Sequence, residues 1–317
     1  MLLGDIGGTH ARFQLCEQGR LLGRTIDRTC TEFSGIEAVI ADVLPILEQK
    51  PRSLLLAVAG PVDGDAVRLT NLGWRFSCSE LKQETGLESC HIINDMAATA
   101  WCLPTLGAAD RLQIGGGSFC VGATMAVIGP GTGLGVAALV PTPQGWTAVE
   151  GEGGHANLAA QGDFDSALLD HLRRERGHVS YEAVLSGPGL VRLYRAVRAV
   201  TGVGSDDEHL SPEDITRMAA AGTEPVAQRV LTTFCRLLGS FSGDLALIYG
   251  ARGGIYIAGG IVPLLGQLFD HDEFRQHFEA KGRLSHFVAS IATCVIVKPL
   301  PALTGLAHLA GSGTYAR

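Results

Sequence analysis

Lysine is scarce in this chain of 317 residues: the four copies are Lys50, Lys82, Lys281 and Lys298, and none follows a glycine in the G-K-[ST] pattern of a Walker A loop. The chain also lacks a basic run, and its net charge is −7. Proteins that bind nucleic acid concentrate Lys and Arg on one surface. These absences exclude the P-loop class and argue against nucleic acid or an anionic membrane as a partner.

Export and membrane signals are also missing. Met1 is followed directly by Leu2 and Leu3, without a basic segment or a long apolar run. Residues 112–149 carry no charge, but the glycine-rich segment 129–135 divides them into halves of strand length, well short of the ~20 residues of a spanning helix. We therefore predict a cytoplasmic protein in which this stretch forms two buried strands around a glycine turn.

None of the eight cysteines forms a C-x-x-C pair, and most stand in apolar runs. Without an export signal, this pattern predicts reduced, mostly buried thiols rather than a disulfide framework. Neither H-E-x-x-H nor H-x-x-E-H occurs, so no zinc site is expected.

Short apolar strands alternate with amphipathic helices along the whole chain, which predicts an α/β protein, and the length favours two domains. The predicted strands are 2–6, 11–16, 21–26, 53–59, 89–94, 125–128, 134–140, 254–258 and 293–297. The predicted helices are 36–47 with Ser34 as its cap, one from about 96, 164–176, 181–185, 190–200, 212–221, 224–249 and 302–309. Residues 2–15 and 125–139 share a strand, a glycine turn with a threonine and a second strand, which suggests an internal duplication.

Three glycine-rich segments adjoin strands: 5–9 (DIGGT), 129–135 (GPGTGLG) and 258–260 (AGG). In the absence of a phosphate-loop lysine, backbone N–H groups in such turns, hydroxyls and Mg²⁺ are the remaining means of binding phosphate. Each segment alone is most simply a hairpin turn. Three of them, each beside a strand, favour a phosphate site.

Asn94 and Asp95 stand where a buried strand ends and a helix begins, a usual place for functional side chains in α/β sheets. A carboxylate there can accept the proton of a substrate hydroxyl. The alternative is that Asp95 only caps the helix.

The loop 150–155 (EGEGGH) places two carboxylates and an imidazole in a glycine-rich segment, a composition suited to sugar hydroxyls. Glu182 is expected in the first turn of its helix, where it would favour the helix dipole.

Taken together, the motifs 4–12 (GDIGGTHAR), 93–97 (INDMA), 129–135 (GPGTGLG), 151–155 (GEGGH), 185–190 (LSGPGL) and 257–263 (IAGGIVP) resemble those of the bacterial glucokinases in order and spacing. That resemblance implies two ribonuclease-H-like domains of the hexokinase, actin and Hsp70 ATPase architecture with a cleft between them. It places a small domain at 1–108, with a C-terminal helix 302–317 packing back on it, and a large domain at 109–301.

The resemblance also implies roles for single residues. Asp95 would be the general base on the glucose 6-hydroxyl, and the sugar hydroxyls would be held by Asn94, Asp95, Glu152, His155 and Glu182. The first phosphate segment would be Asp5, Gly7, Gly8 and Thr9, with Asp5 holding Mg²⁺ through water. Gly131 and Thr132 would form the second phosphate segment, Gly259 and Gly260 would contact adenosine, and the loop 70–74 would border the sugar.

The resemblance therefore implies phosphorylation of glucose by ATP with Mg²⁺, without zinc, in a homodimer. Two rivals stay open: a kinase of another hexose or N-acylhexosamine, and a sugar-responsive regulator on a kinase scaffold. A regulator would need a DNA-binding helix-turn-helix, usually before the first strand, and here that strand begins at Leu2. Many relatives have Asn at the place of His10, so the role of His10 is left open.

Overall fold

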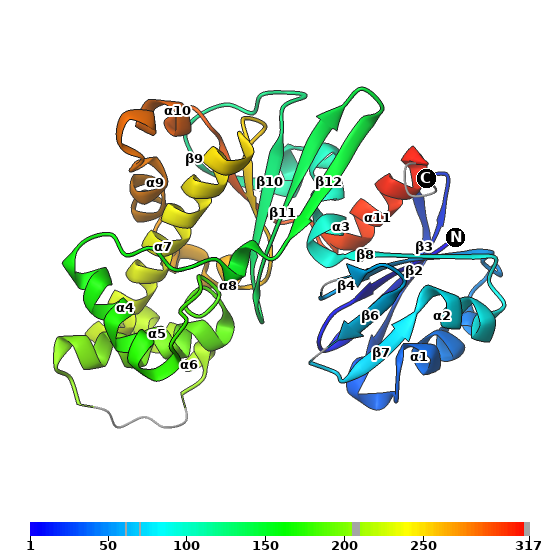
Figure 1. Cartoon of the computed structure of the whole chain (residues 1–317), viewed down its shortest axis with the longest axis horizontal. Helices are drawn as coiled ribbons and strands as arrows, with labels where there is room; N and C mark the ends of the chain where they lie inside the picture. The colour runs from blue at the N-terminus through cyan, green and yellow to red at the C-terminus, as the bar shows by residue number, and fades with distance from the viewer. Residues whose placement is uncertain (61, 70, 205–209, 314–317) are drawn as a thin grey trace. The chain divides into compact units, whose positions relative to one another are not determined.

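A computed structural model describes residues 1–60, 62–69, 71–204 and 210–313, apart from the side chain of Asp63 (Figure 1). The chain forms two compact units. Unit 1 contains residues 1–110, 137–150 and the C-terminal segment from 298, and unit 2 contains residues 111–136 and 151–297. The chain therefore passes between the units at four places rather than at one linker.

Unit 1 is built on a sheet with the strand order β3-β2-β1-β4-β8. Its strands are β1 Leu2–Ile6, β2 His10–Glu17, β3 Arg20–Thr29, β4 Ser53–Val58 and β8 Ser89–Asn94. β1 pairs with β2 in antiparallel fashion and with β4 in parallel, and β4 pairs in parallel with β8. β4 is buried along almost its whole length, as its unbroken apolar sequence predicts for a central parallel strand.

Four helices belong to unit 1: α1 Ile36–Val43, α2 Cys78–Thr85, α3 Asp95–Cys102 and α11 Pro301–Ser312. α11 packs closely on α3, because Gly305 leaves no Cβ against the carbonyl oxygen of Ala98, and His308 Nδ1 lies 2.8 Å from the carbonyl oxygen of Trp101. The predicted Ser34 cap is wrong. Gly35 is the N-cap of α1, and no side chain caps it.

A small antiparallel sheet was not predicted from the sequence. It consists of β5 Val62–Asp63, β6 Ala66–Leu69 and β7 Trp74–Ser77. These strands are shorter than the apolar runs that reveal buried strands, so only the turn at Gly64, whose φ is +60°, gave a signal.

The second sheet has the order β12-β11-β10-β13-β14-β9. Its strands are β9 Arg111–Gly115, β10 Met125–Pro130, β11 Leu134–Thr142, β12 Gly145–Gly151, β13 Ile255–Ile257 and β14 Thr293–Ile296. The charge-free stretch 112–149 therefore forms strands, as predicted, although β9 and β12 were not.

The two sheets repeat one topology. The order β3-β2-β1-β4-β8 in the first sheet corresponds strand for strand to β12-β11-β10-β13-β14 in the second, with β9 added at the edge. The internal duplication is thus present in the structure, and the predicted fold class, α/β with two ribonuclease-H-like domains, is confirmed.

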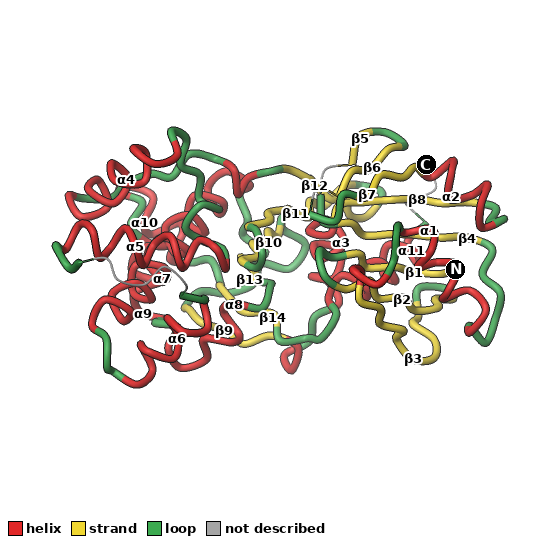
Figure 2. The backbone as a smooth tube through the Cα atoms, turned by 90° about the horizontal axis from the view of Figure 1, so that it is seen from below, coloured by secondary structure: helices red, strands yellow, loops and turns green. Residues whose placement is uncertain are grey.

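Seven helices are described in unit 2: α4 Asp163–Arg176, α5 Gly187–Thr201, α6 Pro212–Ala221, α7 Pro225–Tyr249, α8 Ile261–Leu265, α9 His271–Glu279 and α10 Ser285–Ala289 (Figure 2). α7 packs against α5, α6 and α9. Among the described residues, α7 is the one helix whose length and composition would allow it to cross a membrane, but 72% of its most apolar window is buried in the protein. It is therefore the core helix of unit 2, and Gly239 lets it approach the backbone of α9 at Phe274.

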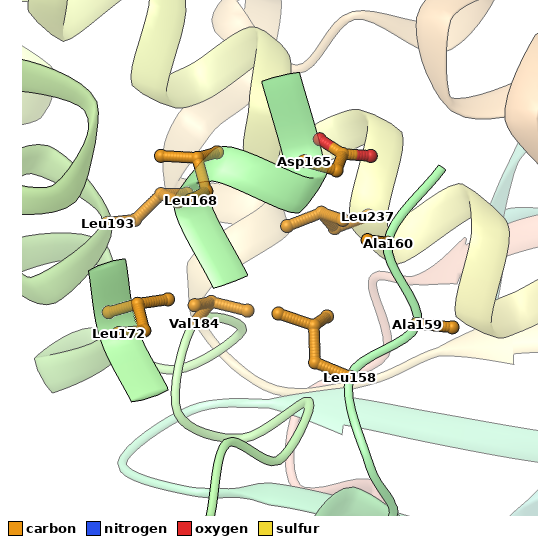
Figure 3. A pocket seen from close by; sticks show the side chains of 9 residues that line it. All are labelled: Leu158, Ala159, Ala160, Asp165, Leu168, Leu172, Val184, Leu193 and Leu237. Carbon is orange, nitrogen blue, oxygen red and sulfur yellow. The ribbon is translucent and has the colours of Figure 1, made fainter. Parts of the chain in front are cut away.

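A small cavity of about 10 Å³ lies in the core of unit 2 and is lined mainly by leucines, most of them from α4, α5 and α7 (Figure 3). A space of this size holds at most a water molecule, so it is not a substrate site. Asp165 at its edge pairs with Arg236. Burial raises the pKa of Asp165, and Arg236 opposes that rise.

All eight cysteines are free thiols, and six of them are buried. This agrees with the prediction of reduced, mostly buried cysteines.

Candidate functional site

The first glycine turn joins β1 to β2. Its closing hydrogen bond runs from the Gly7 N–H to the carbonyl oxygen of His10 at 2.9 Å. Gly8 and Thr9 at its tip are exposed, so their N–H and hydroxyl groups are available to a ligand. The turn follows the carboxyl end of a central strand, which is where α/β sheets bind ligands.

Asp5 lies on β1 directly before this turn, opposite Arg12 in the register of β1 and β2. Burial raises the pKa of Asp5 to about 6, although the positive charge of Arg12 lowers it and Asp27 adds a smaller increase. A carboxylate that is costly to ionise gains stabilisation from a cation placed beside it. The position therefore suits a residue that faces a metal ion.

His10 points to Asp27 of β3 rather than standing alone. Its Nδ1 lies 2.9 Å from Asp27 Oδ1, and Arg12 Nε donates to Asp27 Oδ2 at 3.0 Å. Burial raises the pKa of Asp27, but the hydrogen bonds from His10 and Arg12 outweigh it and leave the pKa lowered. Sequence reasoning missed this Arg12–Asp27 pair. The alternation of β2 and β3 is the signal that could have placed the two side chains on one face.

Asn94 and Asp95 lie at the junction of β8 and α3. Asn94, not Asp95, is the N-cap: its Oδ1 accepts the N–H groups of Met96 at 2.8 Å and Ala97 at 3.2 Å. Its Nδ2 donates to the carbonyl oxygen of Gly60 at 3.3 Å. Asp95 is the first helical residue, and its Oδ1 also accepts the Met96 N–H at 2.8 Å. The capping role is therefore filled by Asn94, and both residues are half-buried.

The ends of β1 and β8 share one edge of the first sheet, because β1, β4 and β8 run parallel. Two strand spacings separate them, about 10 Å. Asp5 and its glycine turn thus stand at the same edge as Asn94 and Asp95.

Of the loop predicted to border the sugar, Thr70 lies outside the described residues. The amide of Asn71 lies beside the first glycine turn, 3.7 Å from where a Cβ on Gly8 would stand. Trp74 begins β7 and is buried.

In unit 2 the second glycine turn joins β10 to β11, with the Gly131 N–H bonded to the carbonyl oxygen of Gly133 at 2.8 Å. A Cβ on Gly131 would meet only open space, and Thr132 is exposed. Gly259, with φ +78°, packs against the turn, since a Cβ there would lie 2.3 Å from the carbonyl oxygen of Pro130. Gly260, exposed next to it, is the N-cap of α8. The second and third glycine segments therefore adjoin.

The loop after β12 forms a single 3₁₀ turn over Gly153–His155. Glu152 and His155 are exposed, and the His155 N–H bonds the carbonyl oxygen of Glu152 at 3.0 Å. Gly154 is buried against β11, where a Cβ would lie 1.9 Å from the carbonyl oxygen of Leu134. The loop is thus fixed at its centre while both side chains stay accessible.

The helix predicted over 181–185 is absent, and Glu182 stands in a tight turn before α5. The Tyr181 and Glu182 N–H groups bond the carbonyl oxygens of Ala156 and Gly154, which holds this short segment against the loop 153–156 in a turn rather than a helix. The Glu182 carboxylate accepts the Leu134 N–H at 2.9 Å and lies 3.8 Å from His155 Nε2. The structure therefore gathers Gly131, Thr132, Glu152, His155, Glu182, Gly259 and Gly260 around one glycine turn.

The first of the two carboxylates predicted in the loop 150–155 lies in a strand instead. Glu150, at the end of β12, accepts a hydrogen bond from the backbone of Asn94. Burial raises its pKa, and this hydrogen bond opposes the rise.

A protein-family comparison matches residues 2–312 to the glucokinase model. The chain belongs to the glucokinase family. A glucokinase of Aromatoleum aromaticum is 46% identical over 96% of this chain and 93% of its own length, and one of Nitrobacter hamburgensis is 43% identical over 97% and 96%. A crystal structure of a glucokinase from an Antarctic psychrotroph is 38% identical, covers 97% of each chain and superposes with a TM-score of 0.87.

The match to the glucokinase family begins at the first strand and ends in α11, so it covers both units. It confirms the resemblance identified from the motifs. It also separates this chain from regulators that share only the fold.

Proposed function

We propose that this member of the glucokinase family transfers the γ-phosphoryl group of ATP to the 6-hydroxyl of glucose, with Asp95 as the general base. One observation carries the proposal. Asp95, oriented by the Asn94 cap, stands at the same sheet edge as the glycine turn that follows Asp5. A base and a phosphate-binding turn at one edge are the two parts that phosphoryl transfer to a hydroxyl requires.

The sugar would be read mainly by carboxylate and imidazole groups. Glu152, His155 and Glu182 present three such groups on one side of the second sheet's glycine turn. When a sugar lacks a hydroxyl, these partners are left without a hydrogen bond, which costs far more binding energy than a lost apolar contact. Asn94 would donate the second hydrogen of its amide group to the sugar. Its Oδ1 already caps α3, and the first amide hydrogen bonds the carbonyl oxygen of Gly60.

The phosphates would lie against the two glycine turns, with backbone N–H groups in place of a lysine. Gly8 and Thr9 are exposed in the first turn, and open space surrounds Gly131 in the second. Gly259 and Gly260, beside the second turn, would contact adenosine. Catalysis then consists mostly of positioning and of neutralising charge on the transferred group.

Magnesium fits this donor set. The described residues contain no cluster of three or more His, Cys, Asp or Glu side chains able to hold a metal alone. Mg²⁺ commonly uses one carboxylate, water and the phosphates of its substrate. Asp5, with its raised pKa, would be that carboxylate, and the ion would supply neutralisation of the phosphate charge. Zinc is not part of the proposal.

Asp95 would accept the proton of the 6-hydroxyl as the oxygen of that hydroxyl attacks the γ-phosphorus. The bond from the γ-phosphorus to the bridging oxygen breaks, and ADP leaves with that electron pair. Water must be kept from the γ-phosphate, because it would compete with the sugar. A cytoplasmic location and a homodimer stay predictions.

A panel of hexoses tests the substrate. With ADP release as the readout, kcat/KM should be highest for glucose and at least about tenfold lower for fructose, mannose and N-acetylglucosamine. A higher kcat/KM for one of these sugars would identify the rival substrate. No turnover of any sugar, together with sugar-dependent binding of DNA, would favour the regulator.

A further inference from the structure

One carboxylate in unit 2 contacts two segments that are proposed to bind different substrates. Glu182 Oε2 accepts the backbone N–H of Leu134 at 2.9 Å, and Leu134 directly follows the phosphate-binding turn. Glu182 Oε1 lies 3.8 Å from Nε2 of His155 in the sugar-binding loop. Each oxygen of the carboxylate therefore faces a different segment.

The glycines around this contact leave room for it. A Cβ on Gly133 would lie 2.6 Å from Glu182 Oε2, so a side chain at this position would force the carboxylate to shift from its place against the Leu134 N–H. Gly154 allows the sugar-binding loop to approach the carbonyl oxygen of the same Leu134. The two loops thus meet at one residue of β11.

Backbone hydrogen bonds tie the Glu182 segment to both loops. The Glu182 N–H bonds the carbonyl oxygen of Gly154 at 2.9 Å, and the Gly187 N–H bonds that of Gly131 at 2.8 Å. About 31% of the Glu182 side chain stays exposed, so the carboxylate is not sealed from a ligand. The position of the turn therefore sets the direction of the carboxylate.

We propose that Glu182 couples the two substrates: nucleotide bound at the glycine turn orients this carboxylate for the sugar, and sugar bound to it stabilises the turn. The inference rests on the proposed function, which assigns the turn to phosphate and Glu182 to the sugar. Phosphates that fix the turn also fix the Leu134 N–H and, through it, Glu182. The effect must be reciprocal, since the coupling free energy belongs to both ligands.

The coupling has a readout that a purely structural role would leave unchanged. The readout is the glucose dissociation constant without nucleotide divided by the constant with nucleotide. If Glu182 only stabilised the fold, its loss would weaken the binding of each ligand separately and leave this ratio at the wild-type value. If it couples the sites, that ratio falls toward one. The ratio is obtained by calorimetry with glucose and a non-hydrolysable ATP analogue with Mg²⁺.

The wild-type ratio should be about 5 or more, the lower range of typical coupling. Gly133→Ala should reduce the ratio to within about twofold of one, because its Cβ displaces the carboxylate while the charge and the sugar contact stay. Glu182→Ala should also reduce the ratio to within about twofold of one, and it should weaken the binding of glucose. Glu152→Ala is the matched control: it removes an exposed carboxylate of the proposed sugar-binding loop. Glucose binding should weaken while the ratio stays at the wild-type value.

A wild-type ratio within twofold of one would overturn the proposal. So would a wild-type ratio retained in either Gly133→Ala or Glu182→Ala with both ligands bound. These outcomes are distinct from failure of the proposed function, which would appear as a wild-type enzyme that does not phosphorylate glucose.

Discussion

The two glycine turns occupy equivalent places in two sheets of the same topology, yet they obtain their negative charge differently. In unit 1 the strand itself supplies it, since Asp5 is the residue before the last one of β1. In the second sheet the strands on both sides of the turn lie within the charge-free stretch 112–149, and the carboxylate at the turn comes from Glu182, after an intervening helix. The duplicated framework thus places equivalent glycine turns in both sheets, and the carboxylate beside each turn comes from a different part of the chain.

The largest expected effect concerns the base at the end of β8. Asp95→Asn should lower kcat about 100-fold or more, because the amide cannot accept the proton of the 6-hydroxyl. Asn94 should still cap α3, so the melting temperature should change little. Steady-state kinetics on protein with unchanged circular dichroism measures this. Near-wild-type turnover would show that Asp95 is not the general base.

The second turn offers a test of phosphate binding by backbone alone. Gly131→Val should lower the affinity for ATP at least about tenfold, because the new side chain would fill the open space where the phosphates are proposed to lie. Calorimetry with the ATP analogue gives the dissociation constant. Gly116→Val is the control, because Gly116 is exposed after β9 and a Cβ there also meets only open space. Equal ATP affinity in wild type and Gly131→Val would contradict the proposed role of Gly131.

A smaller effect should separate the sugar loop from the turn. Glu152→Ala and His155→Ala should each raise KM for glucose by about 10-fold or more while KM for ATP changes less than about threefold, because both side chains are exposed on the loop proposed to bind the sugar. Equal changes in the two constants would mean that the loop serves the nucleotide or the fold. Glu175→Gln, on the exposed side of α4, should change neither constant.

Asp5 provides a pH test that is specific to unit 1. Burial raises the pKa of Asp5 to about 6, above its unfolded value. The folded chain therefore holds a proton that the unfolded chain has released between about pH 4 and 6, so this group makes stability fall as pH rises through that window and leaves it lowered above pH 6. Asp5→Asn should accordingly stabilise the protein at pH 7.5 by about 1–2 kcal/mol, less than the full pKa shift implies because Asp5 is half-buried, and by nothing near pH 4.

The control for this test has the opposite sign. The pKa of Asp27 is lowered, so its contribution to stability is present at neutral pH and is lost on acidification. Asp27→Asn should therefore reduce the melting temperature at pH 7.5. Asp5→Asn should also raise the Mg²⁺ concentration needed for half-maximal rate. A lower melting temperature for Asp5→Asn at pH 7.5 would show that its charge is stabilised in the free protein.

The smallest signal is expected from the sugar alone. The proposed sugar residues divide between the units, with Asn94 and Asp95 in one and Glu152, His155 and Glu182 in the other. A ligand that binds both groups favours an arrangement that brings them together. Saturating glucose should reduce the radius of gyration in solution scattering and change tryptophan fluorescence, whereas a non-substrate sugar should do neither. Calorimetric binding of glucose with unchanged scattering would rule out closure by glucose alone.

The sequence by itself determined the fold class, the duplicated strand–turn–strand modules and the long helices. Strands such as β4 and helices such as α6, with its Ser211 capping box, can be predicted because their apolar pattern and capping residues are local in sequence. It also indicated the glycine turns, because a turn without side chains beside a strand is a local feature. Short elements with half-exposed faces, β5–β7, β9 and α8–α10, gave too weak a period to be recognised.

Only the tertiary structure decided which of these features act together. Glu182 was expected in a helix, but its segment pairs with the backbone of Gly154, and its carboxylate reaches a residue 48 positions away on β11. The raised pKa of Asp5 and the pairing of His10 with Asp27 likewise depend on neighbouring strands rather than on neighbours in sequence. Burial, register and long-range hydrogen bonds arise when the sheets assemble, and a pattern read along the chain does not contain them.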